Sequence, residues 1–436
     1  MTGRPARCRQ VPHDPDQRPA TPAPPAEPPH VVLVVGTRPE AIKMAPVALA
    51  AATGFGLRTT LVATGQHREL VDHALAAFDV AIDHRLELPD RAGGSQADLF
   101  ASLLPQLDQV LGHLRPDAVL VQGDTASALA GALVATWHQV PLVHLEAGLR
   151  SFDKANPFPE ESYRCLIGAV ADLHLAPTPR AVGHLIGEGV PAHRVVCTGN
   201  TVVDAARFVV ARGEGLAARI TPDPGARRLV VVTVHRRENW GGPLVAICGA
   251  LRAVVARVPD VEVVLPVHPN PMVRGPVLEA LEGVDRIQIV DPLDHPALLG
   301  LLSRATLVLT DSGGIQEEAP TFGVPALVLR ETTERPEAIE AGCAALVGTD
   351  PQVIEERASE LLLDEVARQA MANVANPYGD GCSGERSVAA IRWLLGHGPA
   401  PTPWDPGDQP PAAGAESASG AVSGAVSGGL LLGADR

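Results

Sequence analysis

Short apolar segments recur along the chain, and longer stretches that mix apolar and polar residues separate them. A first series lies at 30–35, 57–63, 118–121, 142–145 and 173–175, and a second at 228–234, 261–265, 286–290, 306–309 and 326–329. Strands with such continuously apolar sequences are buried on both faces, which is typical of parallel sheets covered by helices. The pattern therefore predicts an α/β fold with two doubly wound, Rossmann-like domains facing a cleft. That cleft is the expected place for a site.

The composition changes at both ends of the chain. Residues 1–29 are rich in Pro, Arg, Asp and Gln, and residues 399–436 are rich in Pro, Gly, Ala and Ser. Neither stretch has a composition that forms a core, so we predict that both are disordered tails. Between them we place an N-terminal domain at 30–204 and a C-terminal domain that begins at 205 and ends at 380.

The overall composition narrows the functional classes. The 436 residues are 46% hydrophobic and 19% charged, as in soluble globular proteins. A net charge of −15 argues against a nucleic-acid-binding surface. No apolar run approaches the roughly 20 residues that span a membrane. The six cysteines lack metal-ligand spacing and no apolar signal segment opens the chain, so we expect a cytoplasmic protein without a zinc site.

The turn after the apolar segment 306–309 has the sequence Asp-Ser-Gly-Gly. Gly313 and Gly314 have no Cβ, so a bulky anion can approach the backbone, and Ser312 adds a hydroxyl donor. The amides that open the following helix give a positive dipole end at the same place. We therefore predict that this turn binds a phosphate group.

Two carboxylates, Glu317 and Glu318, lie one turn into that helix. Because carboxylates repel a phosphate, we expect at least one of them to have another partner. Ribose hydroxyls, which donate hydrogen bonds to a carboxylate, are the natural candidate. The alternative is that both side chains only complement the helix dipole.

Basic side chains follow predicted strands in both halves of the chain. Arg38 and Lys43 come after the first strand, at a turn without the GxGxxG fingerprint of dinucleotide-binding proteins. Both can face an anion in the cleft, and a surface pair without a function is the alternative. In the second half His235 and Arg335 also follow strands, and we expect them to contact a diphosphate.

Three acidic residues share the same kind of position in the first half. Asp124 and Glu146 each follow a strand, and Glu160 lies in the loop after Glu146. Any one of them alone could cap a helix or form a structural ion pair. Three acids at one edge of a parallel sheet are better explained as proton-transfer groups whose neighbours set their pKa values apart.

The sequence resembles the non-hydrolysing UDP-N-acetylglucosamine 2-epimerases over about residues 30–395. The motifs that carry the resemblance are GTRPEAIKMAP (36–46), QGDT (122–125), HLEAGLRS (144–151), NPFPEE (156–161), TGNTVVDA (198–205), VTVHRREN (232–239), DSGGIQEEAP (311–320) and TTERPEA (332–338). Their occurrence together and in this order is far more specific than any single motif.

The resemblance implies a glycosyltransferase-B-type fold, in which the C-terminal domain holds UDP and the N-terminal domain completes the sugar site. It also implies that a last helix at 381–398 packs back on the N-terminal domain. The substrate contacts carried over to this chain are Arg38, Lys43, Asp124, Glu146, His235, Ser312, Gly313, Gly314, Glu318 and Arg335. The implied catalytic set is Asp124, Glu146, Glu160 and His235.

Two positions depart from the family pattern, which weakens the transfer at the uracil end. Leu293 stands where the family often has glutamine, and Leu298 where it has an aromatic residue. In bacterial members the substrate also binds in the interdomain cleft as an allosteric activator. Gln66, Arg236 and His268 are the positions carried over for that role.

The resemblance implies an isomerase that interconverts UDP-N-acetylglucosamine and UDP-N-acetylmannosamine by eliminating UDP to 2-acetamidoglucal and adding it back. This chemistry requires no metal ion and no nicotinamide cofactor. The family also implies a cytoplasmic homodimer that serves cell-envelope polysaccharide synthesis. The alternatives are an epimerase for a related UDP-diacetamido sugar, a hydrolysing epimerase, a glycosyltransferase of the same fold and a catalytically silent sugar-nucleotide sensor.

Overall fold

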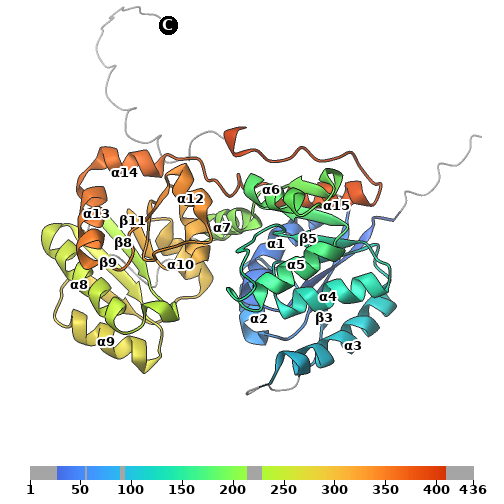
Figure 1. The fold of residues 1–436 in the computed structure, drawn as a ribbon, viewed down its shortest axis with the longest axis horizontal. Helices are drawn as coiled ribbons and strands as arrows, with labels where there is room; N and C mark the ends of the chain where they lie inside the picture. Colours follow the sequence, from blue (N-terminus) through green and yellow to red (C-terminus); the bar gives the residue numbers. More distant parts are fainter. Residues whose placement is uncertain (1–26, 55, 89–93, 214–227, 409–436) are drawn as a thin grey trace, which may run out of the picture.

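The computed structural model describes residues 27–54, 56–88, 94–213 and 228–408, and it contains two parallel sheets side by side, each covered by helices (Figure 1). The predicted α/β class with two Rossmann-like domains is therefore confirmed. The predictions for residues 1–26 and 409–436 lie outside the described residues.

The N-terminal sheet has the strand order β3-β2-β1-β4-β5-β6-β7. Its strands are β1 (His30–Val35), β2 (Arg58–Ala63), β3 (His84–Arg85), β4 (Ala118–Gln122), β5 (Leu142–Leu145), β6 (Leu173–Ala176) and β7 (Val195–Cys197). Val32 of β1 pairs with Thr60 of β2 on one side and with Val119 of β4 on the other. The chain therefore reverses its direction of winding between β1 and β4, where doubly wound sheets hold their ligands.

Helices cover both faces of this sheet because alternate residues of β1 belong to two different cores. Val31, Leu33 and Val35 pack in one apolar cluster, while Val32 and Val34 pack in another. The helices of this domain are α1 (Arg38–Ala52), α2 (Arg68–Ala76), α3 (Gln96–Leu114), α4 (Ala126–Trp137), α5 (Glu160–Val170), α6 (Pro179–Gly187), η1 (Ala192–Arg194) and α7 (Thr201–Arg212).

The C-terminal sheet repeats this topology in the order β10-β9-β8-β11-β12-β13. Its strands are β8 (Arg228–Thr233), β9 (Val261–Pro266), β10 (Ile287–Val290), β11 (Leu307–Thr310), β12 (Ala326–Val328) and β13 (Ala344–Leu346). Its helices are η3 (Arg237–Asn239), α8 (Gly242–Arg257), α9 (Pro271–Leu281), α10 (His295–Leu302), α11 (Gly313–Glu318), η4 (Ala319–Phe322), α12 (Pro336–Ala341), α13 (Pro351–Leu363) and α14 (Glu365–Ala372). The reversal lies between β8 and β11, so each domain has one such ligand position.

Two helices connect the domains. Helix α7 packs against α10, α11 and η4 of the C-terminal domain, and α15 (Ser383–Leu394) returns to pack on α1 and α7 (Figure 1). The α1–α15 contact needs a glycine, because a Cβ at Gly384 would lie only 2.7 Å from the carbonyl oxygen of Pro46. The last helix therefore lies on the N-terminal domain although it follows the C-terminal domain in sequence.

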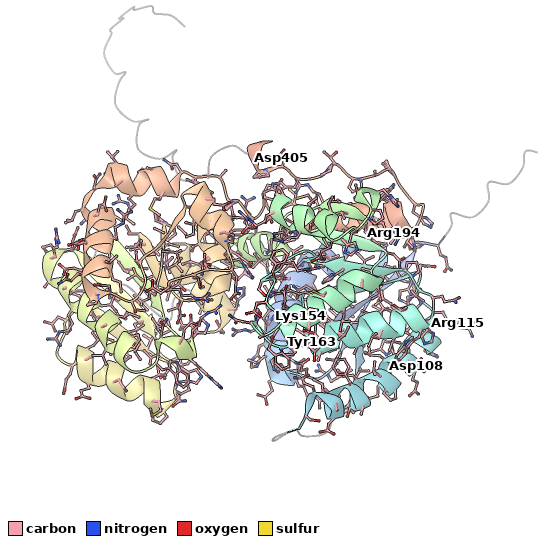
Figure 2. All side chains as sticks on the ribbon, viewed as in Figure 1. Asp108, Arg115, Lys154, Tyr163, Arg194 and Asp405 are labelled. Atoms are coloured by element: carbon pink, nitrogen blue, oxygen red, sulfur yellow. The ribbon has the colours of Figure 1, made fainter. Side chains whose placement is uncertain are left out.

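The chain after α15 differs from the expectation of a tail that begins at residue 399. Trp404 is only 4% exposed, and its backbone amide donates a 2.7 Å hydrogen bond to the carbonyl oxygen of Cys197 in β7. The segment crosses the N-terminal domain and ends in η5 (Pro406–Asp408), and Figure 2 labels Asp405 above the junction of the domains. One buried tryptophan fixes a segment whose composition is otherwise that of a linker.

Three strands were missing from the sequence-based prediction, namely β3, β7 and β13. They contain only two, three and three residues, and each lies at an edge of its sheet. A short edge strand does not need a long apolar run, so the pattern that identifies central strands does not detect it. None of the described helices is long and apolar enough to cross a membrane.

Candidate active site

A cavity of about 530 Å³ lies between the two domains, beside the helix that follows β1 and at the carboxyl ends of the C-terminal strands that flank the reversal. The N-terminal domain contributes α1 and the start of α7, and the C-terminal domain contributes the turns after β8, β9, β10 and β11. The sequence-predicted residues in its wall are Arg38, Lys43, His235, His268, Ser312, Gly314, Glu318 and Arg335. The structure therefore brings together predicted residues that are almost 300 positions apart. Leu293 and Leu298 also line the cavity, so the departures from the family pattern face it.

A buried carboxylate fixes the two turns that face this cavity from the C-terminal domain. Asp311 accepts hydrogen bonds from the backbone amides of His235 at 3.1 Å and Arg236 at 2.9 Å. The side-chain amide of Asn239 donates a further bond of 2.9 Å. Burial would raise the pKa of Asp311, but the hydrogen bonds from His235 and its neighbours hold it below the usual value. Asp311 thus couples the turn after β8 to the turn that begins at Ser312.

The two adjacent glutamates of α11 have different partners. Glu318 accepts a 2.8 Å hydrogen bond from Nε2 of His295, and both side chains line the cavity. Glu317 instead forms ion pairs with Arg335 and, at 3.4 Å, with Lys43. Burial would raise the pKa of Glu317, but these two cations hold it below the usual value. Both glutamates line the cavity, but Glu318 contacts a histidine of the cavity wall while Glu317 holds two cations.

Lys43 connects the two domains through carboxylates. Its Nζ contacts Glu146 of the N-terminal domain and Glu317 of the C-terminal domain. Burial alone would lower the pKa of Lys43, but these two carboxylates raise it above the usual value. Glu146 also accepts a hydrogen bond from Gln122, and Asn200 lies 3.5 Å away. The backbone φ of Glu146 is 63°, in the left-handed region. A non-glycine residue adopts this conformation at a cost of about 1–3 kcal/mol and often at a functional site.

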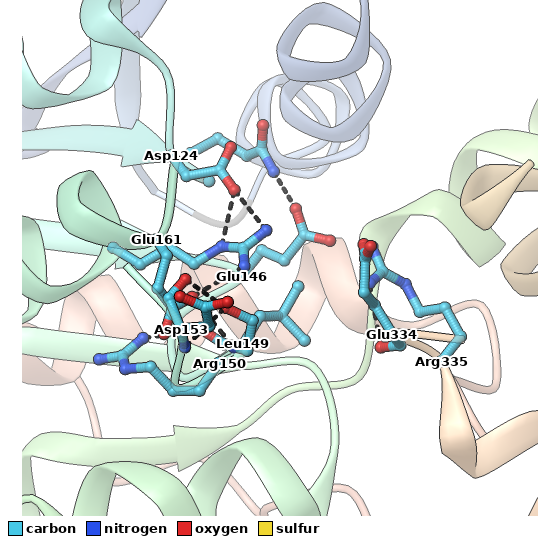
Figure 3. Close-up of polar contacts among 12 residues, drawn as sticks. Asp124, Glu146, Leu149, Arg150, Asp153, Glu161, Glu334 and Arg335 are labelled. Carbon is cyan, nitrogen blue, oxygen red and sulfur yellow. Dashed lines mark hydrogen bonds and ion pairs between the residues drawn. The ribbon is translucent and has the colours of Figure 1, made fainter. Parts of the chain in front are cut away.

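All three predicted acids lie on the N-terminal side of the cleft and outside the cavity wall. Asp124 follows β4 and pairs with Arg164 of α5, whereas Glu160 is the half-buried first residue of α5. Figure 3 shows Asp124 and Glu146 approaching from one domain and Arg335 from the other. The acids thus share one sheet edge, while the cavity extends mainly over the C-terminal domain.

The three positions carried over for an allosteric activator do not meet in one cavity wall. His268 lines the cavity, Gln66 accepts a 2.8 Å hydrogen bond from Ser127 within the N-terminal domain, and Arg236 lies 3.8 Å from Glu334. Gly313 also lies outside the wall, beside the lining residue Gly314. Within the described ranges, no group of three or more His, Cys, Asp and Glu side chains is arranged to hold a metal ion.

Comparison with known proteins places this geometry in a family. A family model described as UDP-N-acetylglucosamine 2-epimerase matches residues 47–392. The chain belongs to the UDP-N-acetylglucosamine 2-epimerase family. A Yersinia pestis UDP-N-acetylglucosamine 2-epimerase is 42% identical over 369 residues, which cover 83% of this chain and 98% of the relative. The family predicted from the sequence motifs is therefore confirmed.

Solved structures of relatives have the same fold. The UDP-GlcNAc 2-epimerase from Neisseria meningitidis bound to UDP-GlcNAc is 36% identical, with a TM-score of 0.74 over 83% of this chain and 99% of that chain. An S. aureus structure solved with UDP is 39% identical, with a TM-score of 0.76 over 86% of this chain and 100% of that chain. The match to the family ends before the segment that contains Trp404.

The structure adds residues to this epimerase-family site that sequence reasoning did not select. Glu40 is fully buried and accepts hydrogen bonds from the hydroxyl of Thr125 at 2.6 Å and from the amides of Gly36 and Thr37 at 3.0 and 2.6 Å. Burial raises its pKa to about 7 although these hydrogen bonds lower it. The Thr-x-x-Glu spacing of Thr37 and Glu40 is a capping-box signal in the sequence. No local signal identifies His295, Arg164 or Asn200.

Proposed function

We propose that this protein interconverts UDP-N-acetylglucosamine and UDP-N-acetylmannosamine without releasing the free sugar. The observation that carries the proposal is the contact of Lys43 with Glu146 and Glu317, because it joins the acids of one domain to the cavity of the other. The cavity volume lies within the range of small-ligand sites. The relatives described with UDP-GlcNAc and with UDP support this choice of ligand.

The chemistry explains why such an enzyme needs two kinds of side chain. The proton at C2 of the sugar is not adjacent to a carbonyl group, so direct deprotonation is very difficult. If the C1–O bond to UDP breaks with its electrons on the diphosphate, loss of the C2 proton leaves a C1=C2 double bond in 2-acetamidoglucal. Return of a proton to the opposite face of C2 and of the diphosphate oxygen to C1 gives the epimer. The leaving diphosphate must therefore be stabilised and the proton must be carried.

The C-terminal residues fit the first requirement. We assign the diphosphate to the turn of Ser312 and Gly314, with His235 and Arg335 as its cationic or hydrogen-bonding partners. Arg335 is held by Glu317, so its guanidinium is already positioned before a ligand arrives. Glu318 is assigned to a ribose hydroxyl.

The N-terminal acids fit the second requirement. Asp124 and Glu146 follow strands, Glu160 opens α5, and all three are assigned to the removal and return of the C2 proton. Lys43 contacts Glu146 and also lines the cavity, so it connects the acids to the phosphate side. Arg38 lines the same wall and adds a second cation there. The family membership further supports a cytoplasmic homodimer as part of this proposal.

The direct test follows UDP-N-acetylglucosamine in heavy water by NMR. We expect UDP-N-acetylmannosamine that carries deuterium at C2, because the removed proton exchanges with solvent before another is delivered. Release of free N-acetylmannosamine would indicate a hydrolysing enzyme instead. Absence of any conversion would support a sugar-nucleotide sensor and contradict the proposal.

The elimination step needs a separate label, because oxidation at C3 would also allow C2 exchange. An ¹⁸O atom placed between C1 and the β-phosphorus should move into the non-bridging β-phosphate positions while UDP is held in the cleft. Oxidation leaves that bond intact and the label in place. Epimerisation with C2 exchange but without movement of the label would rule out elimination.

A further inference from the structure

We infer that Arg164 is a positioning residue that holds the carboxylate of Asp124 in one orientation for the reaction proposed above. Arg164 is on α5 and its side chain is 12% exposed. Its Nε atom donates a 2.7 Å hydrogen bond to Oδ2 of Asp124, and its Nη2 atom forms an ion pair with the same oxygen at 2.7 Å, so both contacts converge on one carboxylate oxygen (dashed lines at Asp124 in Figure 3). Charge-assisted bonds of this kind combine strength with a defined geometry. Arg164 leaves the Oδ1 atom of Asp124 for another partner.

A second carboxylate orients Arg164 from the other side. The Nη1 atom donates a 3.0 Å hydrogen bond to Oε2 of Glu161, whose side chain is 2% exposed. Glu161 in turn accepts bonds from the backbone amides of Ser151 at 3.0 Å and Phe152 at 3.1 Å. Although burial would raise the pKa of Glu161, these donors hold it below the usual value. The guanidinium therefore lies between two carboxylates, and one of them is fixed to the backbone.

This chain of contacts joins the three loops that carry the proposed acids. Glu161 directly follows Glu160, and the loop that begins with Glu146 leads to the Ser151 amide bound by Glu161. Arg164 connects both to Asp124, which belongs to the turn after β4. One network of polar groups thus sets the relative positions of the proposed proton-transfer residues. Catalytic sites need such networks because the reacting atoms must be held within fractions of an ångström.

The charges around Asp124 make Arg164 its decisive neighbour. Glu146 follows β5 and Glu40 belongs to the first turn of α1, and Thr125, the next residue after Asp124, donates a hydrogen bond to Glu40. The Nε2 atom of His144 lies 2.8 Å from the carbonyl oxygen of Gly123, so it is directed at the backbone and not at Asp124. Burial lowers the pKa of His144 to about 3. Glu161 approaches Arg164 and not Asp124. Among the described neighbours, Arg164 is therefore the cation in direct contact with Asp124.

The test uses Arg164→Ala, with added ethylguanidine as a replacement for the missing group. We expect kcat for UDP-N-acetylglucosamine to fall about 10–100-fold, the range for a lost charge-assisted hydrogen bond, with little change in affinity for UDP. Ethylguanidine should restore part of kcat, because it returns a guanidinium group to the place where the Arg164 side chain contacts Asp124. Arg164→Lys, which keeps the charge but not both bonds, should give an intermediate kcat.

The matched control is Arg85→Ala, which removes an arginine that pairs with Asp72 at 2.6 Å in the same domain, on β3 and α2. It should leave kcat unchanged, with or without ethylguanidine. If Arg164→Ala does not fold, Arg164→Lys decides the question: an unchanged kcat would overturn the inference. A folded Arg164→Ala variant whose kcat is unchanged, or does not respond to ethylguanidine, would also overturn it. Absence of epimerisation by the wild type would instead contradict the proposed function, and the inference would fall with it.

Discussion

The two domains share one topology but contribute to the cleft in different ways. In both, the strand order reverses between the first and fourth strands, and the cleft lies at that point. The N-terminal half places paired carboxylates there, with Glu40 fully buried and Glu146 only 9% exposed. The C-terminal half presents an imidazole that is 54% exposed, His235, and a glycine turn that lines the cavity. Under the proposed function, the same position in the fold therefore serves proton transfer in one domain and ligand binding in the other.

Burial explains the difference. Acids that carry protons need neighbours that set their pKa values, so they are surrounded by hydrogen bonds before any ligand arrives. Groups that bind a diphosphate must stay accessible to it. The buried carboxylate of Asp311 in the C-terminal half holds the turns in place and is not part of the cavity wall. Glu317 and Glu318 are also buried but line the cavity, and Glu317 joins the two halves through its contact with Lys43.

The largest expected effect comes from replacing the three acids of the N-terminal domain, which should impair catalysis but not UDP binding. Asp124→Asn, Glu146→Gln and Glu160→Gln should each lower kcat by about 10²–10⁴-fold, the usual range for a general acid or base. Affinity for UDP, measured by calorimetry, should change little because these side chains are outside the cavity wall. Some variants should release 2-acetamidoglucal and UDP, since an intermediate that is not reprotonated has time to escape. Full activity in all three variants would remove the acids from the mechanism.

A second prediction concerns a support that only the N-terminal domain has. Strand β7 has no counterpart in the C-terminal sheet, and the Trp404 segment covers it. Trp404→Ala should destabilise that domain by about 3–5 kcal/mol, the cost of removing a buried aromatic side chain. Hydrogen exchange should show faster exchange in β7 and α7 and unchanged rates in β8 and β9. Removal of residues 409–436 is the control and should leave the rates unchanged.

The third prediction concerns UDP binding by the C-terminal domain. Glu318→Gln preserves shape but removes a charged acceptor, so UDP binding should weaken by about 1.5–3 kcal/mol. The partner His295 loses its carboxylate contact, and the melting temperature should change little because the pair lines the cavity and not a core. Calorimetry that gives an unaltered UDP affinity would remove Glu318 from the nucleotide site.

The sequence predicts the fold and the locations of the site residues better than the contacts between their side chains. Central strands are buried on both faces and therefore appear as apolar runs, and the functional residues follow them because sheet edges collect strand ends. Edge strands such as β7 lack that signal. The pair of Lys43 and Glu317 joins residues 274 positions apart, and its formation depends on how the domains pack. The bonds from Arg164 to Asp124 likewise require the helix that carries the arginine to be placed in three dimensions.

The smallest expected effect concerns pH, and it has opposite signs in the two halves. Burial raises the pKa of Glu40 from 4.5 to about 7, so the folded protein binds more protons than the unfolded chain in that range. The free energy of unfolding should therefore fall as pH rises from 4.5 to 7 and stay low above it. The two pKa values limit this contribution to about 3 kcal/mol, and local relaxation on ionisation reduces it, so we expect about 1 kcal/mol.

Glu40→Gln should remove this slope, because the amide oxygen can still accept from Gly36 and Thr37 while its NH₂ group donates to Thr125. Asp311 of the C-terminal half provides the contrast. Its pKa is lowered by its donors, so its contribution to stability is present above pH 3.8 and is lost below that value. Urea unfolding between pH 4.5 and 8 should thus give a flatter profile for Glu40→Gln than for the wild type. Asp311→Asn should shift the whole profile without changing its slope in this window. Equal slopes for Glu40→Gln and the wild type would show that Glu40 is already ionised when buried.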